Sequence, residues 1–114
     1  MRGFSYQALA AFETHPGVSL QALAETIGIP ERTLARRRAS GRLAPEESER
    51  ILRLSSIFEK AVELFEGDVP SAVNWLTRPK RAFENRTALH DARTEVGVRE
   101  VENLIGRLER GVFS

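Results

Sequence analysis

The 114-residue chain has no cysteine, and it contains only one tryptophan, one tyrosine and one methionine. Without cysteine, the protein cannot form disulfides, thiolate zinc sites or a cysteine nucleophile. The sequence also lacks a glycine-rich phosphate loop, a serine-centred nucleophile elbow and any His/Asp/Glu cluster at metal-ligand spacing. These absences predict a protein that is not an enzyme and that needs no metal or cofactor.

Long hydrophobic runs are missing as well. No apolar segment approaches the roughly 20 residues that span a bilayer. The start of the chain, MRGFSYQALAAF, lacks the long apolar stretch and cleavage site of a signal peptide. We therefore expect no membrane partner and a cytoplasmic location. The length suits one compact domain or two small helical subdomains that share a core.

The net charge is only +1, so the distribution of charge is more informative than its sum. Five arginines and a single glutamate, Glu31, lie between Pro30 and Leu43, whereas residues 44–68 are predominantly acidic. The five arginines are Arg32, Arg36, Arg37, Arg38 and Arg42. A basic segment confined to one short stretch indicates a local binding surface for an anionic partner.

Residues 20–38, LQALAETIGIPERTLARRR, have the spacing of a helix-turn-helix. This unit needs a small residue where its helices touch, a residue that tolerates a left-handed turn four positions later, and an apolar residue six positions beyond that. Ala24, Gly28 and Leu34 occupy these three places. Ser19 can cap the first helix, and Pro30 stands where the second helix can begin without losing a needed donor.

On a helical wheel, Arg32 and Arg36 lie nearly opposite Leu34 and one turn apart. Arginine presents a fork of donors that matches guanine edges or a phosphate, so an exposed helix of this kind suits the DNA major groove. The predicted DNA-binding residues are Arg32, Thr33, Arg36, Arg37 and Arg38, the last two directed at backbone phosphates. The alternative to DNA binding is that the arginines form a solvated helix end, where positive charges interact favourably with the helix dipole. Arg37 also falls where many helix-turn-helix units carry an inward apolar residue.

The rest of the chain predicts further helices and no strand, hence an all-α fold. We expect an N-terminal helix-turn-helix bundle (residues 1–43) joined by a long helix to a small C-terminal helical bundle (together residues 44–114). The predicted helices cover residues 5–14, 44–66, 68–76, 87–95 and 98–110, with Gly97 ending the fourth and Gly111 ending the fifth. Trp75 is interpreted as a packing residue.

The long helix is apolar around more than one face. Ile51, Leu54 and Phe58 keep helical spacing, and Leu52 and Ile57 widen the apolar stripe. Either a single monomer core surrounds this helix, or part of the stripe is a subunit contact. Because operators for this motif are commonly two-fold symmetric, we expect a homodimer.

Several segments together resemble the Xre/MbcA/ParS group of antitoxins. They are IPERTLARRR (29–38), GRL (41–43), SERILR (48–53), AVNWLTRP (72–79), TEVG (94–97) and LIGRLERGVFS (104–114). The resemblance implies an Xre-like DNA-binding domain followed by a toxin-binding domain. It also implies a RES-domain toxin that depletes NAD as partner, neutralised by occlusion of its active site, and autorepression through operator DNA. The alternative function is a stand-alone transcriptional repressor with a C-terminal dimerisation domain. The chain departs from the family pattern at Asn85 and Ala88, where relatives tend to carry glycine and proline.

The C-terminal segment is the candidate toxin-binding surface. Phe113 could anchor in a pocket, and nearby charged side chains could pair with a polar cleft. The predicted toxin-binding residues are Arg107, Glu109, Arg110, Gly111, Val112, Phe113 and Ser114. Alternatively, the tail folds back on its own core.

Overall fold

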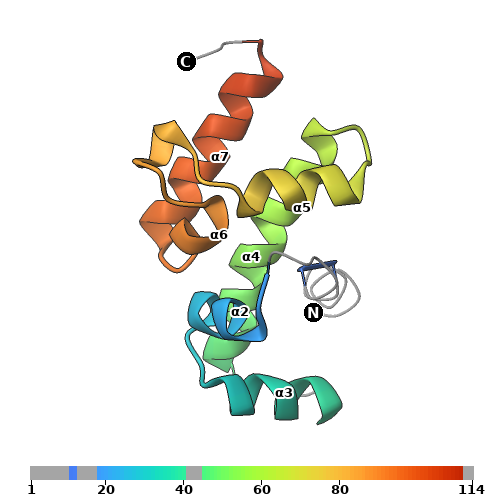
Figure 1. The fold of residues 1–114 in the computed structure, drawn as a ribbon, viewed down its shortest axis with the longest axis vertical. Coiled ribbons are helices and arrows are strands. Elements are labelled where there is room, and N and C mark those ends of the chain that lie inside the picture. The colour runs from blue at the N-terminus through green and yellow to red at the C-terminus, as the bar shows by residue number, and fades with distance from the viewer. Residues whose placement is uncertain (1–10, 13–17, 41–44, 112–114) are drawn as a thin grey trace.

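A computed structural model describes residues 11–12, 18–40 and 45–111, with the side chain of Arg38 left out. Within this part of the chain the regular structure is helical and contains no strand, which confirms the all-α prediction. The elements are α2 (Leu20–Ile27), α3 (Glu31–Ser40), α4 (Pro45–Leu64), α5 (Val69–Thr77), a 3-10 turn η1 (Arg81–Phe83), α6 (Ala88–Asp91) and α7 (Glu95–Glu109) (Figure 1). Of the helix expected over residues 5–14, only Ala11 and Phe12 are described, and both are helical.

The long helix α4 is the axis of the molecule. It packs against α2 near its N-terminal half and against α5 and α7 further along (Figure 1). Ile51, Leu54, Ile57 and Ala61 are fully buried, so one hydrophobic core continues from the helix-turn-helix into the C-terminal bundle. The wide apolar stripe is thus largely explained by packing within one chain. Leu52 is the exception, with 52% of its surface exposed.

Threonine, serine and aspartate side chains start four of these helices, as expected for N-caps. The capping residues are Ser19, Asp68, Thr87 and Thr94, and each accepts a hydrogen bond from a backbone N–H three residues later. Such caps fix where a helix begins because they satisfy donors that have no partner within the helix. None of the described helices is both long and apolar enough to cross a membrane.

The predicted boundary at Gly97 is wrong. Instead of one helix over residues 87–95, α6 spans only Ala88–Asp91, and α7 begins at Glu95 rather than at Val98. Gly97 lies inside α7, where its N–H donates to Thr94 Oγ1 (2.9 Å). A Cβ at this position would lie 1.8 Å from the Asp91 carbonyl oxygen. Glycine is therefore required for the close approach of α6 and α7, and it does not end a helix here.

The loop before α6 shows how the chain tolerates its departures from the family pattern. Lys80 and Arg86 form an antiparallel bridge across it, and Asn85 turns the backbone with a φ of 68°. Asparagine is one of the few residues other than glycine that adopt this left-handed conformation readily. Ala88 is the first residue of α6, a position that proline also suits.

Candidate functional sites

The turn between α2 and α3 has the geometry that the sequence predicts. Gly28 adopts a φ of 84°, and its N–H donates to the Ala24 carbonyl at 2.7 Å. The N–H of Ile29 donates to the same carbonyl at 3.0 Å, which closes the end of α2. Only glycine adopts this backbone conformation without a steric cost, so Gly28 fixes the direction in which α3 leaves the turn.

Helix α3 lies at one end of the molecule (Figure 1). Leu34 is fully buried, and Ala24 of α2 is buried as well, with 3% of its surface exposed. Arg32 and Arg36 are exposed on the side away from Leu34, and Thr33 is half-buried. The structure therefore places two arginines one turn apart on a free helical surface.

Arg37 is placed differently from its neighbours. Its guanidinium donates two hydrogen bonds to the Glu47 carboxylate, from Nε at 2.9 Å and from Nη2 at 3.3 Å. The Glu47 side chain is only 10% exposed. This ion pair occupies the position where a second inward apolar residue is common, and it ties α3 to the start of α4. Arg37 thus has a structural role in addition to the phosphate contact predicted for it.

A second arginine, Arg50 of α4, supports the turn from the other side. Its Nη1 donates to the carbonyls of Ile27 (3.3 Å) and Gly28 (3.4 Å). A cation at the C-terminal end of a helix satisfies carbonyls left without partners and interacts favourably with the helix dipole. Arg50 and Glu47 both lie in the first turns of α4, so this helix orients the candidate DNA-binding helix.

The candidate toxin-binding residues lie at the end of α7. Glu109 and Arg110 are exposed, Gly111 turns the chain with a φ of 78°, and Arg107 is half-buried with its Nε buried and without a hydrogen-bond partner among the described residues. Val112, Phe113 and Ser114 lie outside the described residues. In the candidate DNA-binding site, the side chain of Arg38 also lies outside the described part of the chain.

The two candidate sites are at opposite ends of the molecule. Its longest dimension is 42 Å, with α3 at the bottom and the end of α7 at the top of Figure 1. A partner bound at one end would therefore leave the other end accessible.

Thr26 joins the two halves of the fold across the interface of α2 with α6. Its hydroxyl is within hydrogen-bond distance of the Ala22 carbonyl (3.1 Å) and of the Leu89 carbonyl (3.2 Å), which is 63 residues away in the chain. The sequence interpretation missed this contact. It also missed Glu47 and Arg50. The available signal for Glu47 was the inward position of Arg37 in α3, because a charged residue at an inward position needs a counterion nearby.

Two charged clusters in the C-terminal bundle are structural. Arg86 donates to the buried carboxylate of Asp91 (Nε to Oδ1, 2.7 Å), and this hydrogen bond raises the pKa of Arg86. Lys80 Nζ lies 4.2 Å from the centroid of the Trp75 ring. Burial, with a smaller effect of the Arg78 charge, lowers the pKa of Lys80 to about 8. Trp75 is thus a packing residue that also holds a cation.

Comparison with family models assigns both halves of the chain. Residues 1–56 match the antitoxin Xre-like helix-turn-helix domain, and residues 60–111 match the antitoxin Xre/MbcA/ParS C-terminal toxin-binding domain.

Three curated relatives carry the name antitoxin Xre. The protein from Yersinia enterocolitica is 41% identical over 113 residues, which is 98% of this chain and 76% of the relative. The Photorhabdus laumondii protein is 40% identical over 76% of this chain and 60% of its own length. The Pseudomonas putida protein is 32% identical over 73% of this chain and 52% of its own length.

A solved structure shares the fold. A chain in the crystal structure of the M. tuberculosis MbcT-MbcA toxin-antitoxin complex superposes with a TM-score of 0.69, and the match covers 100% of both chains. The sequence identity is 22%, so this likeness concerns the fold alone.

Proposed function

Because the chain belongs to the Xre/MbcA/ParS family of antitoxins, we propose that it neutralises a cognate RES-type, NAD-depleting toxin and represses its own operon as a DNA-binding homodimer. Neither activity requires a catalytic group. The toxin would be inhibited by occlusion of its active site, and transcription would be repressed by occupation of an operator.

The observation that carries the DNA-binding part is the exposure of Arg32 and Arg36 on a helix whose direction is fixed. Gly28, Arg50 and the Arg37–Glu47 ion pair hold α3 in place. Preorganised arginines one turn apart suit successive base edges in the major groove. Thr33 lies beside them, and Arg37 and Arg38 are assigned to phosphate contacts.

The toxin-binding part is supported by the chemistry at the end of α7 and by its distance from α3. Arg107, Glu109 and Arg110 offer charges of both signs, and Gly111 redirects the chain toward Val112, Phe113 and Ser114. An aromatic anchor with flanking charges is the composition of a binding hot spot. Because this end lies far from α3, the same protein could hold toxin and DNA together.

Replacing Arg32 or Arg36 by alanine tests the DNA-binding part. We expect each change to weaken operator binding by about 1–3 kcal/mol, because a bidentate contact to a base is lost. Arg81→Ala is the matched control, since Arg81 is an exposed arginine in the C-terminal bundle. Fluorescence anisotropy with operator and random duplexes measures both effects. Equal affinity of the wild type for the two duplexes would refute specific recognition.

Coexpression with the enzyme encoded by the adjacent gene tests the toxin-binding part. The full chain should restore growth and copurify with the toxin, and a chain lacking residues 111–114 should do so poorly. Unchanged affinity after this deletion would exclude the tail as the inhibitory segment. Failure of the full chain to rescue growth or to copurify would instead favour a stand-alone repressor.

A further inference from the structure

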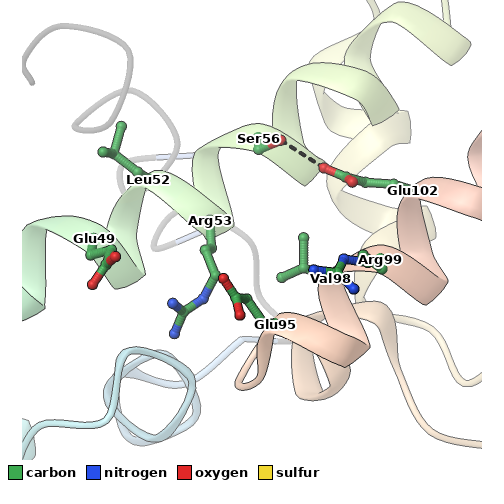
Figure 2. Close-up of a pocket in the computed structure, with 8 residues that line it drawn as sticks. All are labelled: Glu49, Leu52, Arg53, Ser56, Glu95, Val98, Arg99 and Glu102. Atoms are coloured by element: carbon green, nitrogen blue, oxygen red, sulfur yellow. Dashed lines mark hydrogen bonds between the residues drawn. The ribbon is translucent and has the colours of Figure 1, made fainter.

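A groove of about 320 Å³ runs between α4 and α7 (Figure 2). Each helix contributes one stripe of residues to its walls. The α4 wall consists of Glu49, Leu52, Arg53 and Ser56, and the α7 wall consists of Glu95, Val98, Arg99 and Glu102. In Figure 2, Arg53 extends from α4 toward Glu95, while Ser56 donates to Glu102 at 2.9 Å.

The two walls carry the same order of side chains at the same helical spacing. Each begins with a glutamate, followed three residues later by an aliphatic residue and four residues later by an arginine. Residues at this spacing lie on one face of a helix. Along either wall, the sequence of chemical groups is therefore acid, apolar, base.

Two features of the α4 wall indicate that it has a partner. Leu52 is 52% exposed, and it and Val96 are the large hydrophobic residues most exposed in the described part of the chain. Arg53 Nε is buried without a hydrogen-bond partner among the described residues. Arg53 as a whole is half-buried and makes no ion pair among the described residues, so the accessible part of its guanidinium, and not the buried Nε, can pair with a carboxylate of a second molecule.

We propose that a second copy of this chain occupies the groove, with the two α4 helices antiparallel and crossing next to Leu52, midway between Glu49 and Arg53. When two such stripes pack antiparallel, the glutamate of one copy lies opposite the arginine of the other, once on each side of the two-fold axis. With the two-fold axis midway between residues 49 and 53, Glu49 of each copy faces Arg53 of the other, and the two Leu52 side chains pack side by side next to the axis. Such self-complementarity is what a two-fold symmetric interface requires. The inference rests on the homodimer of the proposed function and names its interface.

The position of the groove links this contact to DNA recognition. Residues 49–56 belong to the half of α4 that supports the helix-turn-helix, since Arg50 bonds to the carbonyls of Ile27 and Gly28. A dimer centred next to Leu52 would therefore join the two copies beside their DNA-binding units. The toxin-binding ends would remain at the far side of each copy.

Exchanging Leu52 for glutamate tests the apolar centre of the interface. Sedimentation equilibrium of the full chain should show a dimer for the wild type and at least a tenfold higher dimer dissociation constant for Leu52→Glu, because two carboxylates would lie side by side next to the axis. Val96→Glu is the matched control, since Val96 is 66% exposed and does not line this groove. It should leave the dissociation constant unchanged. Circular dichroism and melting temperature would verify that both variants fold.

A charge exchange tests the antiparallel register. Glu49→Arg alone and Arg53→Glu alone should each weaken the dimer about tenfold or more, because each places like charges opposite one another. Mixing the two variants should restore association, since every contact in the mixed dimer again pairs an arginine with a glutamate. If Arg53→Glu folds poorly, Glu49→Arg alone keeps the test valid, because Glu49 is exposed; Glu49→Gln, which removes the charge without reversing it, should then weaken the dimer less than Glu49→Arg does.

The outcomes distinguish the groove interface from dimerisation itself. A dimer that Leu52→Glu leaves intact, or a mixture that fails to restore association, overturns the groove interface but not dimerisation. A monomeric wild type with normal operator binding overturns both. Loss of toxin neutralisation by Leu52→Glu with an unchanged dimer would assign the groove to the toxin instead and would likewise overturn this proposal.

Discussion

The N-terminal and C-terminal halves of this molecule are held together by different means. Helix α3 buries one large apolar side chain completely, Leu34, and is oriented by polar contacts from Glu47 and Arg50. The C-terminal bundle is held by close packing of α4, α5 and α7 around residues such as Leu76 and Ile105. The helix that presents arginines outward thus has little core of its own, and its position depends on α4.

Two glycines illustrate the same contrast. Gly28 is needed for its backbone conformation, with a φ of 84°, and the nearest group to a Cβ there would be the end of the flexible Arg50 side chain at 3.1 Å. Gly97 is needed for space, because the Asp91 carbonyl lies against it. The first requirement is local, whereas the second arises only when two helices are packed.

The largest effect is expected from Gly97→Ala. A Cβ would lie 1.8 Å from the Asp91 carbonyl oxygen, so α6 and α7 must move apart. We expect the free energy of unfolding to fall by about 3 kcal/mol or more, at the upper end of overpacking effects. Urea denaturation followed by circular dichroism measures this change.

Gly106→Ala is the control in the same helix. The nearest atom to a Cβ there is the side-chain Nη1 of Arg110, at 3.4 Å. Alanine should stabilise α7 by about 0.5–1 kcal/mol through helix propensity. If both variants lose stability equally, the close contact at Gly97 does not limit packing as described.

Gly28 and Gly97 also show how much of the fold could be predicted from the sequence. The helix-turn-helix was predicted correctly because its determinants at Ala24, Gly28 and Leu34 lie within eleven residues of each other. The boundary near Gly97 was wrong because a glycine that ends a helix and a glycine that lets helices touch look alike in sequence. The same limit applies to Arg37, whose charge was visible but whose partner Glu47 lies ten residues further along the chain, in the next helix. The roles of the arginines in DNA binding stay predictions.

Arg37→Ala should separate stability from DNA recognition. Removing the guanidinium deprives the buried Glu47 carboxylate of this partner, and we expect a loss of about 1–2 kcal/mol in the free energy of unfolding. Arg36→Ala, one residue away and exposed, should change stability little and mainly weaken operator binding. Denaturation and anisotropy on both variants check this. Equal stability of the two would mean that the ion pair does not anchor α3.

Thr26→Val should weaken the connection between the two halves. The substitution keeps the shape of the side chain but removes the hydroxyl near the buried Leu89 carbonyl, which we expect to cost about 1 kcal/mol. Thr77→Val is the control, because among the described residues the Thr77 hydroxyl donates only to carbonyls of its own helix, those of Val73 and Asn74. Chemical denaturation compares them. Similar losses for both variants would argue that the contact between α2 and α6 contributes nothing specific.

The smallest effect is a dependence of stability on pH through Lys80. Its pKa in the folded protein is about 8, below the value of about 10.4 in an unfolded chain. Between these values the unfolded chain binds more protons, so raising the pH from 8 toward 10.4 stabilises the fold. The destabilising contribution of the charged lysine is fully present below pH 8. A Lys80→Met variant should lack this rise, as denaturation at pH 7 to 10 would show.

The ring of Trp75 opposes this shift, since its face attracts the charged form of Lys80 at 4.2 Å. Trp75→Leu should therefore lower the pKa of Lys80 further, by about half a unit if the contact is worth about 0.5–1 kcal/mol. Titration of the lysine side-chain signals by NMR measures the pKa directly. A pKa that rises in Trp75→Leu would show that the ring acts on Lys80 mainly by excluding water, and the packing of α5 against the following loop would then determine its charge.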